Sequence, residues 1–362
     1  MPSFRSPTPN LYNVMHRRLP VYLLIDCSES MIGEGLDAVR SGLAQMLSVL
    51  RQDPHALETA WLSIISFGAS AKVLSPLTEI TEVQEPNLVL GQGTCLGSAL
   101  ELLSKQVQAE VRKSTQESKG DYRPLVILLT DGQPTDDWEA AKKRFDQKMK
   151  KTIANMYVIG CGQAIDYKSL CKISDIVLSL PDMTPESMRK LFVWMTQTVS
   201  TASVGTSGPE TGDIPGMEIL PKEINRVKPG GVGMPTATMQ IFLPGICSIE
   251  KNKYLMRYIK DGETSKYLGT HAHKLDSVEV ESSEIKSLDQ QEEVNLDVGV
   301  PCPYCEAEGW VKCESCGIHY CAGSLMQIEK ISENMETICP SCNARLRLAF
   351  GGDKFEADFS RG

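Results

Sequence analysis

Five oxygen-bearing side chains have the types and spacing that could bind a divalent cation. Asp26, Ser28 and Ser30 alternate along the chain, so their side chains can converge on one point. Thr94 follows a glycine-rich segment, and Asp131 follows a run of apolar residues. Hard cations prefer oxygen ligands, and Mg²⁺ usually keeps several waters in its octahedron. These residues therefore predict a site for Mg²⁺, Mn²⁺ or Ca²⁺ that leaves a position for water or for an acidic group of a partner.

The residues between 19 and 200 predict the elements that position this site. Apolar residues spaced by three and four predict helices from Ile32 to Leu50 and from Leu96 to Val111. Short apolar runs predict buried strands at 21–25, 60–67, 125–130, 153–159 and 176–180. The alternation predicts an α/β fold, a doubly wound and mostly parallel sheet with helices on both faces. Ligands of such sheets bind at the carboxyl ends of the strands, where Asp26 and Asp131 fall.

Residues next to the proposed ligands are expected to have structural roles. Cys27 and Cys95 are small residues suited to burial, and Glu29 is expected to be exposed. Asp136 and Asp137 are expected at a helix N-terminus, where the helix dipole favours acidic side chains.

The cysteines near the end of the sequence indicate a second metal centre. Seven of the twelve cysteines lie between Cys302 and Cys342, and they include three C-x-x-C pairs. Four thiolates make the closed tetrahedral site that structural zinc prefers. We expect the zinc to be a structural staple, because this segment has few large apolar residues with which to fold alone.

The pairing of these zinc ligands stays open. Our first choice joins the two C-P-x-C pairs, Cys302 and Cys305 with Cys339 and Cys342. An alternative set is Cys302, Cys305, Cys313 and Cys316. A second zinc would use Cys313, Cys316 and Cys321 together with His319.

Composition divides the chain into five predicted segments: an N-terminal extension (1–18), the α/β domain (19–200), a linker (201–235), a small β-rich segment (236–300) and a zinc-ribbon domain (301–362). The linker is rich in Gly, Pro, Ser and Thr. Asp276 to Asp297 holds eight acidic residues and one lysine, which is typical of a solvated stretch.

Charge and hydropathy argue against two classes of partner. The net charge is −9 and the cysteine-rich end is also acidic, so we expect no nucleic-acid binding and no membrane binding. We see no apolar run near the roughly 18 residues of a membrane span and no secretory signal, so we expect a cytoplasmic protein.

The first site resembles the metal-ion-dependent adhesion site (MIDAS) of von Willebrand factor type A (vWA) domains. The pattern of that family is D-x-S-x-S, then a threonine in a glycine-rich loop, then an aspartate after an apolar strand. All of its positions are filled, by Asp26, Ser28, Ser30, Thr94 and Asp131. The resemblance covers about residues 19 to 200. It implies that the two serines and one of Thr94 or Asp131 contact the metal directly, while the others act through water.

Nearly the whole chain resembles the TerY-like proteins of bacteria, which combine a vWA domain with a terminal zinc ribbon. The resemblance is carried by Tyr22–Ser30, Thr94–Leu100, Leu128–Pro134, Leu243–Cys247 with Tyr254–Leu255, and the ribbon. It implies a place in tellurium-resistance and stress-response gene clusters. It also implies a serine/threonine kinase and a PP2C-type phosphatase as partners, with this protein as an adaptor or substrate.

The residues favour binding over catalysis. Two carboxylates and three hydroxyls supply no evident arrangement of base and nucleophile, and we find no G-x-S-x-G, Walker loop or H-E-x-x-H. We therefore predict a non-enzymatic, metal-dependent protein-binding or scaffold protein. The alternatives are a RING-like ligase built on the cysteines and a magnesium-dependent phosphatase at the first site.

Overall fold

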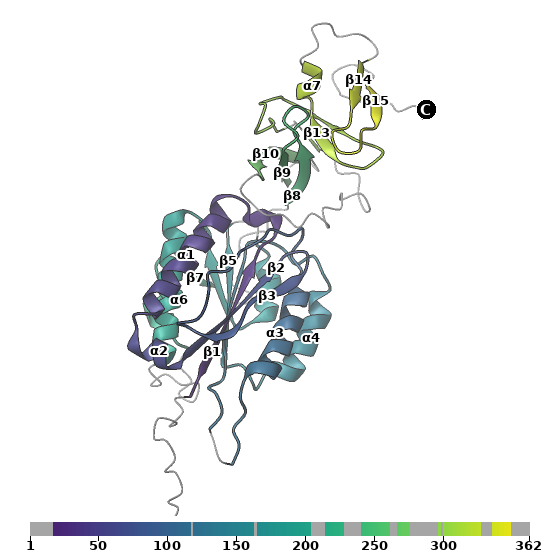
Figure 1. Cartoon of the computed structure of the whole chain (residues 1–362). Coiled ribbons are helices and arrows are strands. Elements are labelled where there is room, and N and C mark those ends of the chain that lie inside the picture. Colours follow the sequence, from purple (N-terminus) through teal and green to yellow (C-terminus); the bar gives the residue numbers. More distant parts are fainter. Residues whose placement is uncertain are drawn as a thin grey trace, which may run out of the picture.

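A computed structural model describes residues 17–116, 119–162, 165–203, 214–227, 240–260, 266–275, 296–297, 300–326 and 335–348 of the chain. An α/β domain spans Leu19 to Val227, and a smaller β-rich unit spans Gln240 to Leu348 (Figure 1). The predicted N-terminal extension and most of the acidic stretch lie outside the described residues.

The α/β domain is built on a seven-stranded sheet with the order β3-β2-β1-β4-β5-β6-β7. The strands β1, β2, β4, β5 and β6 pair in parallel, whereas β3 and β7 are antiparallel at the two edges. The predicted doubly wound, mostly parallel sheet is confirmed. The strands are β1 (Leu19–Asp26), β2 (Ala60–Phe67), β3 (Ala71–Glu79), β4 (Leu125–Thr130), β5 (Asn155–Cys161), β6 (Ile176–Leu180) and β7 (Asn225–Val227).

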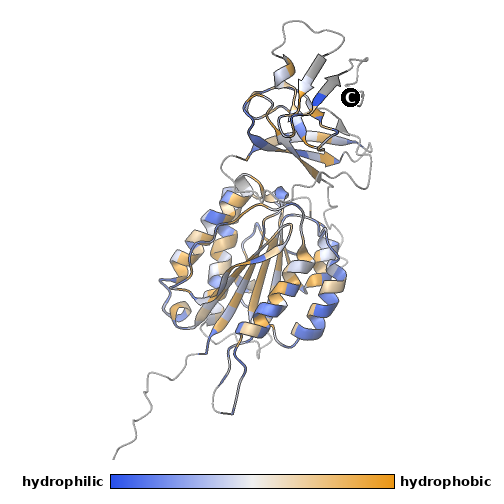
Figure 2. Ribbon diagram, turned by 45° about the vertical axis from the view of Figure 1, so that its right-hand side comes forward, coloured by the Kyte–Doolittle hydropathy of each residue, from blue (hydrophilic) through white to orange (hydrophobic). Residues whose placement is uncertain are grey.

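Helices cover both faces of this sheet, with α1, α2 and α6 on one side and α3 and α4 on the other (Figure 1). Along β1, Leu23 and Ile25 belong to the first buried cluster, while Tyr22 and Leu24 belong to the second. Both faces of the strand are therefore buried, which explains its unbroken apolar sequence. Figure 2 shows hydrophobic colour on the sheet and hydrophilic colour on the outer helix surfaces. The helices are α1 (Glu34–Leu50), α2 (Pro54–Thr59), α3 (Leu96–Glu110), α4 (Trp138–Met149), α5 (Tyr167–Ile173) and α6 (Pro185–Ser203).

The segment predicted as a linker is in part a piece of the α/β domain. Residues 214–227 pack on the sheet and end in β7, which pairs with β6. Two buried side chains bind the backbone of this segment: Tyr157 donates to the Pro215 carbonyl at 2.6 Å, and Trp194 donates to the Gly216 carbonyl at 2.7 Å. Side chains of the segment also contribute, since Ile224 is buried in the core and Met217 and Leu220 pack against it. The Gly, Pro, Ser and Thr of the surrounding residues concealed this packing.

The β-rich unit contains a six-stranded sheet with the order β11-β10-β9-β8-β13-β12 and a separate hairpin, β14-β15. Because β13 pairs with β8, the boundary predicted near residue 300 does not separate two sheets. The elements are β8 (Gln240–Ile246), β9 (Lys253–Lys260), β10 (Tyr267–Lys274), β11 (Leu296–Asp297), β12 (Trp310–Lys312), β13 (His319–Cys321), α7 (Gly323–Met326), β14 (Met335–Ile338) and β15 (Arg345–Leu348).

Among the described residues, no helix has the length and apolar character needed to cross a membrane.

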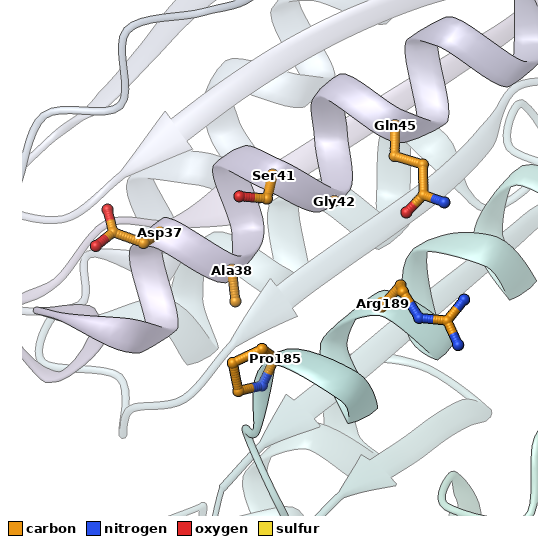
Figure 3. A pocket seen from close by; sticks show the side chains of 7 residues that line it. All are labelled: Asp37, Ala38, Ser41, Gly42, Gln45, Pro185 and Arg189. Atoms are coloured by element: carbon orange, nitrogen blue, oxygen red, sulfur yellow. The ribbon is translucent and has the colours of Figure 1, made fainter.

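Close packing of α1 on α6 depends on Gly42. A Cβ on Gly42 would lie 2.2 Å from the nearest ring carbon of Phe192, which is buried on α6. Figure 3 shows Gly42 on α1 facing α6, beside a groove lined by side chains of both helices.

We expect Gly42→Ala to destabilise the domain. Overpacking costs about 1–3 kcal/mol, and the higher helix propensity of alanine recovers at most about 1 kcal/mol. Thermal unfolding followed by circular dichroism should show a melting temperature lower by a few degrees. Ser41→Ala, at the exposed neighbouring position, is the matched control and should not lower it. Equal melting temperatures for the two variants would contradict this account of the helix contact.

Candidate metal centres

Two adjacent strands and one loop position the first candidate site. Asp26 is the last residue of β1 and Asp131 follows β4, and these strands run in parallel as neighbours. The chain leaves β1 for β2 on one side and later returns to β4 on the other, so the site lies where the strand order reverses. Gly91 forms a bridge to Ser28 and donates its N–H to the Cys27 carbonyl at 2.8 Å, which attaches the Thr94 loop to the same edge.

The structure brings the four predicted ligands from the strand ends into one hydrogen-bonded chain. The Ser28 backbone N–H donates to Asp26 Oδ1 at 2.8 Å. The Ser28 and Ser30 hydroxyl oxygens lie 2.9 Å apart, and Ser30 donates to Asp131 Oδ1 at 2.6 Å. Thr130 donates to Asp26 Oδ2 at 2.5 Å and thereby holds that carboxylate against the sheet edge.

Gly132 locates the point on which the hydroxyls converge. A Cβ built on Gly132 would lie 2.7 Å from Thr94 Oγ1, 3.5 Å from Ser30 Oγ and 3.7 Å from Ser28 Oγ. The three hydroxyls from two loops therefore surround one small volume next to Asp131. A cluster of hydroxyl and carboxylate oxygens around such a volume fits a hard divalent cation.

The electrostatics at the carboxyl ends of β1 and β4 also favour a bound cation. Burial raises the pKa of Asp26 to about 6, although hydrogen bonds from Ser28 and Thr130 oppose the rise. Burial raises the pKa of Asp131 well above its usual value, and the negative charge of Asp26 raises it further. Two buried carboxylates repel each other when both are ionised. A divalent cation between them would offset both the repulsion and the lost hydration.

Neighbouring acidic residues have more specific roles than the sequence suggested. Glu29, expected to be exposed, is half-buried and accepts the Gly93 N–H at 2.5 Å, which helps to hold the Thr94 loop. Asp137 caps α4 as expected, whereas Asp136 caps α3 by accepting the N–H groups of Gly97 and Ser98 at 3.0 Å each. This cross-loop cap depends on tertiary structure, so the local sequence contained no signal for it.

The cysteines form two groups whose composition differs from the predicted pairing. The first is Cys247, Cys302, Cys305 and Cys321, and the second is Cys313, Cys316, Cys339 and Cys342. The first-choice set of Cys302 and Cys305 with Cys339 and Cys342 is thus divided between the two groups. The alternative that joined Cys302 and Cys305 to Cys313 and Cys316 is divided in the same way.

The sequence assigned His319 and Cys321 to a possible second zinc, and the structure places only one of them in a cysteine group. His319 is buried edge-on against Trp310, with ring centroids 4.7 Å apart, and it lies in neither group. Cys321 joins the first group, and Cys247 completes it. Sequence reasoning missed Cys247 because this residue lies more than fifty positions before the cysteine-rich segment.

Within each group the sulfur atoms are spaced as ligands of one ion. Cys305 and Cys321 Sγ are 3.5 Å apart, as are Cys313 and Cys342 Sγ, and Cys316 and Cys339 Sγ are 3.8 Å apart. Zinc–sulfur bonds of about 2.3 Å in a tetrahedron place sulfurs about 3.8 Å apart, whereas a disulfide would place them about 2.0 Å apart. Both groups therefore fit zinc.

Seven of these eight cysteines lie in four turns that share one backbone pattern. In each turn, the residue four positions after a cysteine has a positive φ and donates its N–H to that cysteine's carbonyl. These residues are Lys251, Glu306, Gly317 and Asn343, with φ of 63°, 58°, 74° and 61°. The turn of Cys247 carries Glu250 where the other three carry a second cysteine. Cys321 at the end of β13 supplies the missing fourth sulfur.

Hydrogen bonds favour the thiolate form of one cysteine in each group. Although burial opposes the shift, donors from the Ser248 hydroxyl and backbone N–H lower the pKa of Cys321 to about 7. A backbone N–H of Ala344 is the main cause that lowers the pKa of Cys342 to about 7. Thiolates are the form that binds zinc.

The fold and the first site define an α/β domain with a cation-binding loop cluster at the carboxyl ends of its strands. Residues 21–183 match the family model of the von Willebrand factor type A domain. This part of the chain is therefore a vWA domain, the class whose MIDAS binds a metal and commonly mediates protein interactions.

Comparison with solved structures found partial matches at low identity, and this chain covers less than two thirds of the length of the first of them. The PilB minor pilin from Streptococcus sanguinis is 14% identical, with a TM-score of 0.40 over 56% of this chain and 65% of that chain. The von Willebrand factor type A protein from Catenulispora acidiphila is 16% identical, with a TM-score of 0.40 over 75% and 68%. The pilus adhesin SpaC from Lactobacillus rhamnosus GG is 14% identical, with a TM-score of 0.40 over 52% and 30%. A comparison with curated proteins found no match.

We expect Gly132→Ala to weaken cation binding at the first site strongly. The backbone of Gly132 has no positive φ, so alanine causes no backbone strain there, but its methyl group would enter the volume between the hydroxyls and displace the Thr94 side chain. Titration with Mn²⁺ followed by electron paramagnetic resonance should show at least tenfold weaker binding than in the wild type. Gly93 has a φ of 80°, so it is an unsuitable control. Gln133→Ala changes the exposed next residue and should leave Mn²⁺ binding unchanged.

We expect two zinc ions in the wild-type chain and one in Cys247→Ser. The second group does not include Cys247, so it should retain its ion. Elemental analysis of the purified protein measures the ratio of zinc to protein. Cys171→Ser, outside both groups, and His319→Ala should both retain two ions. Two ions in Cys247→Ser would contradict the assignment of Cys247 as a ligand.

Proposed function

We propose that this protein is a non-catalytic, metal-dependent protein-binding protein. A divalent cation, Mg²⁺ or alternatively Mn²⁺ or Ca²⁺, would be held by Asp26, Ser28, Ser30, Thr94 and Asp131. The open coordination position would take an acidic side chain of a protein partner. The observation that supports this most directly is the pair of buried carboxylates joined through Ser28 and Ser30 beside Gly132.

The hydrogen bonds of the site favour binding over catalysis. Asp26 accepts hydrogen bonds from the Ser28 backbone and from Thr130, and Asp131 accepts one from Ser30. Each carboxylate is thus directed at groups of the site itself and not outward as a general base. A general base must reach the proton that it removes, so this arrangement gives little support to a phosphatase.

The partner that we propose belongs to a phosphorylation module. The resemblance to TerY-like proteins supports an adaptor or substrate that works with a serine/threonine kinase and a PP2C-type phosphatase. The resemblance also supports a cytoplasmic role in a tellurium-resistance type of stress response. The two zinc ions would be structural staples of the β-rich unit.

A second candidate, a RING-like ligase, is favoured by one observation. The groups interleave along the chain, since Cys302, Cys305 and Cys321 alternate with the two pairs of the second group. This order is that of a cross-brace. We rank it second because the first group also needs Cys247 from the end of β8, which fuses the cross-brace to the sheet and suits a structural role.

We expect Asp26→Ala to lose capture of the partner. Affinity purification from extracts of the native cell should recover a partner with wild-type protein and Mg²⁺, and lose it with EDTA or with Asp26→Ala. Asp37→Ala is the matched control, because Asp37 is exposed at the start of α1 and the change in charge is the same. Circular dichroism checks that both variants fold. The idea fails if Asp26→Ala captures the same proteins as the wild type.

A further inference from the structure

The sheet of the β-rich unit has two chemically different faces. Partners across an antiparallel pair project from the same face. Phe242 pairs with Arg257, which pairs with His271, and Leu255 pairs with His273. One face of β8, β9 and β10 therefore carries two apolar side chains together with a guanidinium and two imidazoles. The opposite face carries Leu243, Met256 and Ala272, which pack with Cys302 and Cys321 in the core of the unit.

The face with Arg257 is turned toward the vWA domain. Phe242 and Leu255 belong to the same continuous buried cluster as Met31 and Ile32, which follow the metal-site serines. A Cβ on Gly33 would lie 3.4 Å from His273 Nδ1. Figure 1 shows that β8, β9 and β10 are the part of the second unit nearest to the end of the vWA sheet. The loop after Ser30 and the sheet of the second unit are thus in contact.

Arg257 lies on the same face as His273, whose ring approaches Gly33. In the strand register it stands between Phe242 and His271, two residues from Leu255. Burial, then His271, then the positive charge of Arg257 lower the pKa of His273 to about 4. Arg257 is half-buried and His271 is exposed, so this part of the face is reachable by solvent.

From these contacts we infer that Arg257 and the metal site of the vWA domain form one composite binding surface for an acidic protein segment. This inference rests on the proposed function, because the metal would bind one carboxylate of the segment. Arg257 would bind a second carboxylate, for which the planar guanidinium offers two parallel N–H donors. The two units together would then select a segment with two nearby acidic residues, where a bare metal site requires only one.

The positive charge of Arg257 should affect metal binding and peptide binding in opposite directions. A substitution of Arg257 can therefore separate the two affinities. A cation next to the site repels a divalent ion and attracts a carboxylate. We expect Arg257→Glu to weaken binding of an acidic segment at least tenfold while Mn²⁺ binds equally well or more tightly. A residue with a merely structural role would not separate the two affinities in this way.

The test uses the full chain and a defined probe. A fluorescein-labelled peptide of alternating glutamate and glycine, and the same peptide with glutamine for glutamate, are titrated by fluorescence anisotropy with Mg²⁺ at low salt. Mn²⁺ binding is measured separately on the same proteins. Lys274→Glu is the matched control, because Lys274 pairs with Tyr254 and so lies on the opposite face. Arg257→Lys keeps the charge without the planar pair of donors and should bind the glutamate peptide with intermediate affinity.

The outcomes separate the two proposals. Weaker binding of the glutamate peptide by Arg257→Glu, with Mn²⁺ binding and the Lys274→Glu control intact, supports the composite surface. Equal peptide affinities for Arg257→Glu and Lys274→Glu overturn it and leave the proposed function standing. Wild-type protein that binds Mn²⁺ but discriminates neither peptide also overturns it. Wild-type protein that binds no Mn²⁺ overturns the proposed function itself.

Discussion

The arrangement of the vWA domain follows from two carboxylates buried at one edge of a sheet. Asp26 and Asp131 end adjacent parallel strands, so the sheet itself brings them together. Ionised carboxylates in such a place are costly unless a cation or several donors accompany them. Ser28, Ser30 and Thr130 supply donors, and the Thr94 loop is tied to the same edge through Gly91 and Glu29. The loops around the site therefore stabilise the two buried carboxylates and leave them accessible to a metal ion.

Much of the vWA domain could be predicted from sequence because its signals are local. The buried strands are continuous apolar runs, and the D-x-S-x-S motif places its side chains by alternation within five residues. The order of strands then brought Thr94 and Asp131 to the same edge. What failed were features that depend on contacts between distant segments. Residues 214–227 pack on the core through Ile224 and its apolar neighbours and through backbone carbonyls that accept from distant side chains, and Asp136 caps a helix other than its own.

The two cysteine groups show the limit of motif spacing in a different way. A C-x-x-C pair determines that two sulfurs share an ion, but not which other pair completes the tetrahedron. Parallel pairing of β13 with β8 decides this, because it carries Cys321 to the turn that holds Cys247. That turn keeps the backbone geometry of a zinc knuckle, including the positive φ of Lys251, while Glu250 replaces its second cysteine. Only three of the four knuckles could therefore be found from the cysteines themselves.

The sheet of the β-rich unit connects the two candidate metal centres, because one of its faces packs on the first cysteine group and the other meets the loop of the first site. The first cysteine group lies in the core on one face of β8 and β9, with Cys247 following the end of β8. The other face meets the loop after Ser30 and carries Arg257. A small unit with a small apolar core gains stability from a bound structural metal. Zinc on one face would therefore make rigid the surface that approaches the divalent cation on the other. A metal ion bound by these cysteines would then affect partner binding without touching the partner, because the position of Arg257 depends on this sheet.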